Sequence, residues 1–260
     1  MIEPPLLEVQ SLTVRFGGIV ALHDISFTVT RGECVGVIGP NGAGKSTLMN
    51  AISGLVRTGM GSITLDGVNL LQIGIAQRAE LGIGRTFQHS RLFSGLPVID
   101  QLLCGHYSRT EYAFFGALSR RPSVVREERD LRDKAEELLR RLGLGNMAHL
   151  PVSELSGAHR RLVDLGRALM IVPRALLLDE VAAGLTMQEK SHLAALLRQE
   201  QTENQTSMIV IEHDLDFVRS LAQSTVVIAE GAVIASGQTA EVLGRPEVLE
   251  AYVGAPEVAS

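Results

Sequence analysis

The chain has 260 residues, a length that suits one large α/β domain with or without an inserted subdomain. Hydrophobic residues make up 45% of it, so it can bury a sizeable core, which argues against disorder. The net charge of −5 argues against binding nucleic acid through general basicity, and we expect no nucleic-acid partner. Binding of a small nucleotide stays open, because it needs only one local site.

The two cysteines, Cys34 and Cys104, are far apart and form no CxxC pattern. This disfavours a disulfide framework or a zinc site and suits a reducing compartment. The N-terminal residues MIEPPLLEV lack the features of a signal peptide, and no apolar window reaches the roughly 18 residues of a membrane span. We therefore expect a soluble cytoplasmic protein, whose high mean hydropathy suggests a large partner interface.

Short apolar segments predict strands along the first third of the chain. The first covers residues 7–14 (LEVQSLTV), and GSITLDG is another. The stretch SFTVTRGECVGVIG predicts a hairpin around Arg31–Gly32 that ends in a strand over Cys34–Ile38. Between the strand over Cys34–Ile38 and GSITLDG, the stretch KSTLMNAISGL predicts a helix. Three of its apolar residues lie on one face: Leu48, Ile52 and Leu55.

After Phe93 the chain becomes highly charged, and REERDLRDKAEELLRRLGL predicts a helix. Its apolar residues recur at helical spacing: Leu131, Ala135, Leu138, Leu139 and Leu142. A solvated helix with one buried face explains this pattern better than a partner-binding helix does. A second helix is expected from Gly157 to about Met170.

The rest of the chain alternates between predicted strands and helices. ALLLD is a strand, SHLAALLRQEQ a helix, SMIVIEH a strand, and TVVIA with AVIAS a hairpin. The apolar runs CVGVIG, ALLLD and MIVIE lack a polar face, which is typical of strands buried on both faces. The sequence therefore predicts an α/β fold with a mostly parallel central sheet between helices.

The stretch GPNGAGKST matches the phosphate-loop pattern GxxxxGK[ST] in full. Glycines allow a tight nest of backbone N–H groups around phosphate, and the helix that follows adds a positive dipole end. We expect Lys45 to reach the β- and γ-phosphates and Ser46 to be a ligand of Mg²⁺. The predicted nucleotide-binding residues are Gly39, Pro40, Asn41, Gly42, Ala43, Gly44, Lys45, Ser46 and Thr47. The loop alone does not identify the task, since kinases, GTPases, helicases and transporters share it.

Three further segments carry candidate site residues. In ALLLDE, Asp179 is a candidate Mg²⁺ ligand and Glu180 is placed to polarise an attacking water. In MIVIEHDL, His213 follows a strand and could hydrogen-bond a γ-phosphate. In GRTFQHSRLF, Gln88 could contact Mg²⁺ or the attacking water. A lone histidine is more often structural, and a lone glutamine carries almost no signal.

In the order of these segments the chain resembles the ATP-binding subunits of ABC transporters, and the resemblance covers nearly the whole chain. The family's Walker A loop corresponds to residues 39–47, its Q-loop glutamine to Gln88 and its switch histidine to His213. Its Walker B aspartate and catalytic glutamate correspond to Asp179 and Glu180. The resemblance implies an ATPase that uses ATP and Mg²⁺.

The family's LSGGQ signature corresponds to LSGAH in this chain. The resemblance implies that four of its residues close over the ATP held by a partner subunit: Ser156, Gly157, Ala158 and His159. The family's adenine-stacking aromatic residue would be Phe16, in VRFGG. A buried phenylalanine at a strand end is nearly as compatible with that position.

The resemblance also implies a domain plan. Residues 1–260 would form one P-loop ATPase domain of ABC type, with an N-terminal antiparallel β subdomain and an inserted helical subdomain. The β subdomain and nucleotide-binding core would take 1–90 and 160–240, the helical and signature subdomain 91–159, and a C-terminal tail 241–260.

A finer resemblance points to importer ATPases for branched-chain amino acids and the wider hydrophobic amino-acid group, which includes amide and urea carriers. It rests on GIGRTFQHSRLF, the long segment 105–150, AAGL and the ending VLEAYVGA. It implies a peripheral subunit on the cytoplasmic face of the inner membrane, in a head-to-tail homo- or heterodimer. The dimer would dock on integral membrane permease subunits through the Gln88 loop and residues near 90–150. A periplasmic or extracellular substrate-binding protein would supply the cargo.

Four residues depart from the family's pattern. Ala158 and His159 replace Gly and Gln of the signature, Val181 replaces a proline, and Thr186 replaces the Asp or Asn of the D-loop. If position 158 needs a positive φ, alanine costs on the order of 1 kcal/mol there. We therefore expect a weakened composite site over the partner's nucleotide, while the chain's own half-site is complete.

Two alternatives to an importer ATPase stay open at this point. Related ABC-type ATPases act in non-transport assemblies such as DNA repair or ribosome control, although those usually carry long coiled-coil inserts or two cassettes. The altered signature also leaves open a nucleotide-binding regulatory subunit with low turnover.

Overall fold

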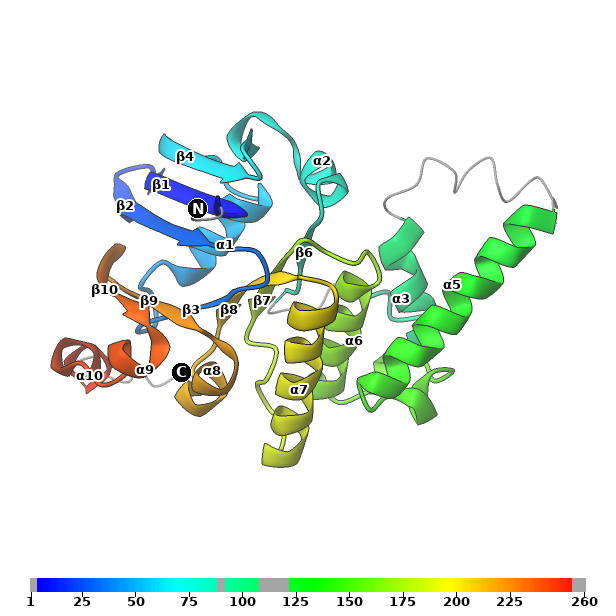
Figure 1. Cartoon of the computed structure of the whole chain (residues 1–260). Helices are drawn as coiled ribbons and strands as arrows, with labels where there is room; N and C mark the ends of the chain where they lie inside the picture. Colours follow the sequence, from blue (N-terminus) through cyan, green and yellow to red (C-terminus); the bar gives the residue numbers. More distant parts are fainter. Residues whose placement is uncertain (1–3, 88–91, 108–121, 254–260) are drawn as a thin grey trace.

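The structure, a computed structural model, describes residues 4–87, 92–107 and 122–253, in which two sheets are flanked by helices (Figure 1). The strands are β1 (Leu7–Phe16), β2 (Ile19–Val29), β3 (Cys34–Ile38), β4 (Met60–Leu65), β5 (Val68–Asn69), β6 (Ile83–Arg85), β7 (Ala175–Asp179), β8 (Ser207–Ile211), β9 (Ser224–Ala229) and β10 (Ala232–Gln238). The helices are α1 (Lys45–Ser53), α2 (Ile75–Glu80), α3 (Val98–Tyr107), α5 (Pro122–Arg141), α6 (Gly157–Leu169), α7 (Met187–Glu203), α8 (Leu215–Leu221), α9 (Thr239–Val242) and α10 (Pro246–Val253). Within these residues, no helix is both long and apolar enough to cross a membrane.

The larger sheet has six strands in the order β10-β9-β3-β8-β7-β6. Strands β9, β3, β8, β7 and β6 run parallel, and only β10 is antiparallel to its neighbour. Alternate side chains of β3 enter different cores: Cys34 and Ile38 pack on the helical side, Val35 and Val37 on the other. The predicted mostly parallel sheet, buried on both faces, is therefore confirmed, as is the hairpin of β9 and β10.

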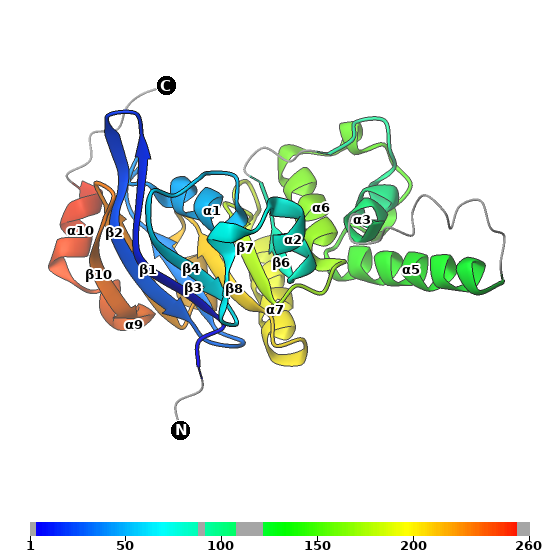
Figure 2. The ribbon, with the colours of Figure 1, turned by 90° about the horizontal axis from the view of Figure 1, so that it is seen from above.

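The smaller sheet is antiparallel, in the order β2-β1-β4-β5. It packs over α1 and one face of the larger sheet (Figures 1 and 2). Leu12, Ile52 and Val37 therefore lie in one core. The predicted N-terminal antiparallel part of an α/β P-loop fold is thus present.

The hairpin predicted around Arg31–Gly32 is wrong, because β2 and β3 belong to different sheets. The turn between them is held by β8 of the larger sheet and by α7. Gly32 N–H donates to Ser207 Oγ at 2.9 Å, and the Gly32 carbonyl accepts from Gln201 Nε2 at 3.1 Å. These partners are more than 160 residues away in sequence, so local turn signals could not show that the chain crosses between sheets here.

The helix α1 ends two residues earlier than its apolar pattern suggests. Leu48 and Ile52 are buried as expected, but the helix ends at Ser53. Gly54 adopts φ 84°, a left-handed conformation that ends helices, so Leu55 falls outside α1 and is 40% exposed. Placing Leu55 on the buried face was therefore wrong.

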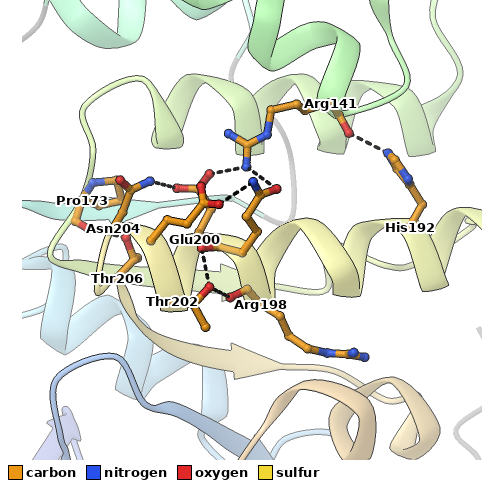
Figure 3. Close-up of polar contacts among 10 residues, drawn as sticks. Arg141, Pro173, His192, Arg198, Glu200, Thr202, Asn204 and Thr206 are labelled. Carbon is orange, nitrogen blue, oxygen red and sulfur yellow. Dashed lines mark hydrogen bonds and ion pairs between the residues drawn. The ribbon is translucent and has the colours of Figure 1, made fainter.

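Helices α3, α5 and α6 lie at the end of the molecule opposite α9 and α10 (Figures 1 and 2). The predicted apolar stripe from Leu131 to Leu142, on α5 and the residue after it, is buried in the core shared with α3 and α6. Arg141 joins the end of α5 to α7 by an ion pair with Glu200 at 2.7 Å (Figure 3). The Arg141 carbonyl also contacts His192 Nε2 at 2.6 Å, so two contacts hold the end of α5 against α7 (Figure 3).

Candidate functional site

The phosphate-loop sequence lies between β3 and α1, at the carboxyl edge of the parallel strands. Gly39, Gly42 and Gly44 have φ values of 147°, 78° and 102°. A Cβ at Gly39 would lie 1.9 Å from the Ile228 carbonyl oxygen, and one at Gly44 would lie 2.6 Å from that of Ala21. Two of the glycines are therefore required by contacts as well as by φ.

The Lys45 amine points back over the loop. Its Nζ donates to the carbonyls of Gly39 at 2.6 Å and Pro40 at 2.8 Å. Burial lowers the pKa of Lys45, and the nearby carboxylates of Glu180 and Asp179 oppose this shift. The cation is thus held at the loop, where it can reach an incoming phosphate.

A polar cavity of about 260 Å³ opens over the loop. Its lining brings together residues from four parts of the sequence: Ala21, Asn41, Gly42, Ala43, Gly44, Lys45, Ser46, Thr47, Glu180, Ile211 and His213. The helix α1 begins here with no side-chain cap and no acid in its first turn. Its first N–H groups and its positive dipole end therefore favour an anion in this cavity.

Asp179, the last residue of β7, is almost fully buried. Its backbone N–H donates to Thr86 Oγ1 at 3.0 Å, and its Oδ2 lies 3.7 Å from Arg85 Nη2. Burial raises the pKa of Asp179, and the Arg85 guanidinium opposes this. Its buried Oδ1 has no hydrogen-bond partner within the described residues, which fits an oxygen that serves a cation.

Glu180 and His213 meet at the edge of the cavity. His213 Nε2 lies 3.1 Å from Glu180 Oε1. Glu180 has φ 51°, an uncommon conformation for a residue with a side chain. Its N–H donates to the Ile211 carbonyl at 2.9 Å, which holds the turn after β7 against the end of β8.

The signature residues lie at the start of α6 and do not line the cavity of this chain. Ser156 is the N-cap, and its Oγ accepts from His159 N–H at 3.1 Å. Ala158 lies within the helix and is absent from the positive-φ residues, so the strain considered for alanine does not arise. His159 Nε2 lies 3.7 Å from Glu189 Oε1, and Glu189 in turn caps α7 with Thr186.

Two other predicted residues have different outcomes. Phe16 is 50% exposed at the end of β1, so the buried alternative is wrong, and it does not line the cavity. Gln88 lies outside the described residues. Across the parts of the chain that are described, no group of three or more His, Cys, Asp or Glu side chains forms a metal cluster.

Two buried acids were missed from sequence; they do not line the cavity but hold the backbone of segments next to candidate site residues. Glu212 Oε1 accepts from Ala182 N–H at 2.7 Å, two residues after Glu180. Asp164 Oδ2 accepts from Phe87 N–H at 2.8 Å and pairs with Arg167. The available signal for Glu212 was a carboxylate directly at the end of the buried apolar run MIVI, because acids are rarely so buried without a partner.

The phosphate loop, the buried parallel strands and the carboxylates at their ends define a P-loop nucleotide-binding α/β protein. The family described as ABC transporter matches residues 22–183, more than half of the chain. The chain therefore belongs to the ABC transporter family and is an ATPase of the ABC type.

Several known proteins are similar over almost the whole length. The chain is 35% identical to the high-affinity branched-chain amino acid transport ATP-binding proteins LivG of Salmonella typhimurium and BraF of Pseudomonas aeruginosa. Each match covers 96% of this chain and 98% of the relative. Among solved structures, a nucleotide-free ATP-binding cassette from an ABC transporter matches with a TM-score of 0.83 at 29% identity, covering 97% of this chain and 100% of that one.

Proposed function

We propose that the chain is the ATP-hydrolysing subunit of an importer for branched-chain amino acids or related small metabolites. The observation that carries the ATPase part is the hydrogen-bonded Glu180–His213 pair at the edge of the phosphate-loop cavity. The importer part is supported by the printed function of the relatives LivG and BraF.

In this proposal Glu180 polarises the attacking water and His213 contacts the γ-phosphate. The 3.1 Å contact between them fixes both side chains on one side of the cavity. A carboxylate that orients water and a preorganised donor near the transferred phosphoryl group are the parts that phosphoryl transfer needs. Residues 39–47 and Lys45 would hold the phosphates, and Phe16 would stack on the adenine.

Mg²⁺ would be held by Ser46 and Asp179, together with Gln88. The unpartnered Oδ1 of Asp179 and the Ser46 hydroxyl at the cavity supply oxygen ligands, the type that Mg²⁺ prefers. The ion would neutralise charge on the β- and γ-phosphates.

A second ATPase subunit would complete the site, as a homo- or heterodimer. Ser156, Gly157, Ala158 and His159 lie away from the chain's own cavity, at the N-terminus of α6. A helix N-terminus favours an anion, which supports their action on the ATP of the partner. The absence of a positive φ at Ala158 supports a smaller loss at the altered signature than the sequence suggested.

Permease subunits would dock on a groove of about 380 Å³ between α2, α3 and α6. Its lining includes three exposed apolar side chains, Leu55, Ile75 and Phe93, beside cationic arginines. Such a patch on the surface marks an interaction site. This contact would place the subunit on the cytoplasmic face of the inner membrane, with a substrate-binding protein acting on the other side.

The domain plan proposed with this function keeps the sequence boundaries. The β subdomain and nucleotide-binding core take 1–90 and 160–240, the helical and signature subdomain takes 91–159, and the C-terminal tail takes 241–260. The placement of α3 and α5 at one end of the molecule supports a separate helical part (Figure 1).

Substitution of Glu180 by Gln tests the ATPase proposal. We expect ATP to bind but its hydrolysis to fall by two orders of magnitude or more, on the order expected for loss of the group that orients the water. The measurement is steady-state ATPase activity together with retention of bound ATP on gel filtration. The exposed Glu241→Gln serves as the control and should keep the wild-type rate. A wild-type rate for Glu180→Gln would reject the assigned role.

Substitution of Ile75 by Glu tests the membrane partner. Ile75 is 51% exposed at the groove, so a charge there should release the chain from membranes that contain its permease while leaving its own ATP binding intact. Ile234→Glu, at an exposed apolar residue of β10, is the matched control. Equal membrane retention of both variants would contradict this docking surface.

A further inference from the structure

Two neighbouring strands end together at the candidate site, and the residues that follow them are joined. Asp179 at the end of β7 lies beside Ile211 at the end of β8. Glu180, the first residue after β7, donates its N–H to the Ile211 carbonyl, and His213 contacts the Glu180 carboxylate. Glu180 is therefore held at both its backbone and its side chain.

Glu212 adds a third contact between the same two segments. Its Oε1 accepts from Ala182 N–H at 2.7 Å. The consecutive residues 211–213 thus hold the turn 180–182 at three points. The two contacts at Glu180 alone would let the turn pivot about that residue. The third contact, at Ala182, fixes the direction of the turn.

The turn needs such support because its backbone is unfavourable. Glu180 has φ 51°, a left-handed conformation that residues with side chains rarely adopt. Conformations of this kind persist only where the surrounding structure holds them, and they gather at functional sites. The contact at Ala182 lies on the far side of Glu180 from β7, where the parallel ladder no longer supports the chain.

Core packing does not explain a glutamate at position 212. The side chain is only 3% exposed. Burial raises the pKa of Glu212 to about 7; the Ala182 N–H opposes this, the neighbouring Glu180 and Asp214 raise it further, and Lys190 lowers it. A buried acid beside a second carboxylate costs stability, and an apolar residue would continue the run of β8 at lower cost.

We propose that Glu212 is a positioning residue for ATP hydrolysis, which holds Ala182 N–H and thereby aims Glu180 at the attacking water. Glu212 does not line the cavity, so it acts through the turn and not on the nucleotide. This inference rests on the proposed role of Glu180.

Two substitutions of Glu212 separate positioning from stability. Glu212→Leu keeps the volume, suits the buried surroundings and removes the acceptor. We expect kcat for ATP to fall about tenfold or more while KM changes less than about threefold, since the loop that binds ATP is untouched. Its Tm should stay near that of the wild type, because removal of the buried charge offsets the lost hydrogen bond. Glu212→Gln keeps an oxygen acceptor and should stay within about threefold of the wild-type kcat.

The matched control is Glu200→Leu, on α7. Glu200 is also a buried, hydrogen-bonded acid, and its partners are Arg141 and Asn204 (Figure 3). None of these three residues lines the phosphate-loop cavity. We expect Glu200→Leu to lower Tm and to leave kcat near the wild-type value. A fall in kcat of the same size in Glu200→Leu and Glu212→Leu would overturn the positioning role, because it would reflect general loosening.

Glu180→Gln is measured in the same assay, so that the two ideas can fail separately. If Glu180→Gln keeps the wild-type rate, the proposed function fails. If Glu180→Gln is inactive while Glu212→Leu keeps its kcat, only the positioning role fails. A Glu212→Gln variant as slow as Glu212→Leu would also overturn it, because the carboxylate and not the hydrogen bond to Ala182 would then be required.

Discussion

The phosphate loop and the signature segment both have glycine at the start of a helix, but the glycine has a different role in each. Gly39 and Gly44 have positive φ and lie against carbonyl oxygens of Ile228 and Ala21. Gly157 has no positive φ, and a Cβ there would meet nothing within 4 Å. The phosphate-loop glycines are thus required by contacts within the chain, whereas Gly157 is exposed and meets no such contact.

The two helix starts differ in the same way. The N-terminus of α1 has no side-chain cap, so its N–H groups remain available to an anion in the cavity. In α6, Ser156 already satisfies His159 N–H. A preformed site and an open surface therefore occur in one chain, which is the arrangement that a second copy or a related subunit could complete. The predictions below test this contrast.

The largest effect is expected at Gly39. A Cβ in Gly39→Ala would lie 1.9 Å from a backbone oxygen, so the loop must move and ATP binding should be lost. Gly67→Ala, in the turn between β4 and β5, is the control: Gly67 has φ 78° and open space but does not line the cavity, so we expect this variant to bind ATP normally and to lose about 1 kcal/mol of stability. Gly157→Ala should bind ATP as the wild type does. Calorimetric titration with ATP measures all three, and equal affinities would remove the contrast.

A smaller effect is expected from the titration of Glu212. Its pKa is raised from the ordinary 4.5 to about 7, so the folded state loses stability as pH rises through this range. Glu212→Gln removes this loss, and its stability relative to the wild type should grow between pH 5 and pH 8 by up to about 3 kcal/mol. Urea unfolding of both proteins at the two pH values measures the difference. A constant difference would mean that Glu212 does not carry the shift.

The smallest effect is expected at the signature. Ala158→Gly with His159→Gln restores the family pattern, and we expect turnover at the partner's site to rise a few-fold. Ala158→Gly alone should cost roughly 0.5–1 kcal/mol of stability, since glycine is unfavourable in a helix. Steady-state ATPase activity and urea unfolding measure the two effects. Unchanged turnover in the double variant would show that the altered signature is already adequate.

Much of the candidate site was predictable because its residues belong to short contiguous motifs. The phosphate loop, Asp179 and Glu180 were found from apolar runs that end in glycine or carboxylates, and the cavity brings most of these residues together. Glu212 and Asp164 were not found, because their roles depend on backbone N–H groups at Ala182 and Phe87. The spacing of residues in the sequence does not predict such contacts between distant segments.

The sequence by itself determined the α/β class, the parallel strands buried on both faces, the phosphate loop and the family, because each depends on local residue types or periodicity. Only the tertiary structure decided that β2 and β3 lie in different sheets, that Ala158 has an ordinary backbone and that Glu212 binds the turn after Glu180. These features depend on which distant segments meet, and that is set by the packing of the whole chain.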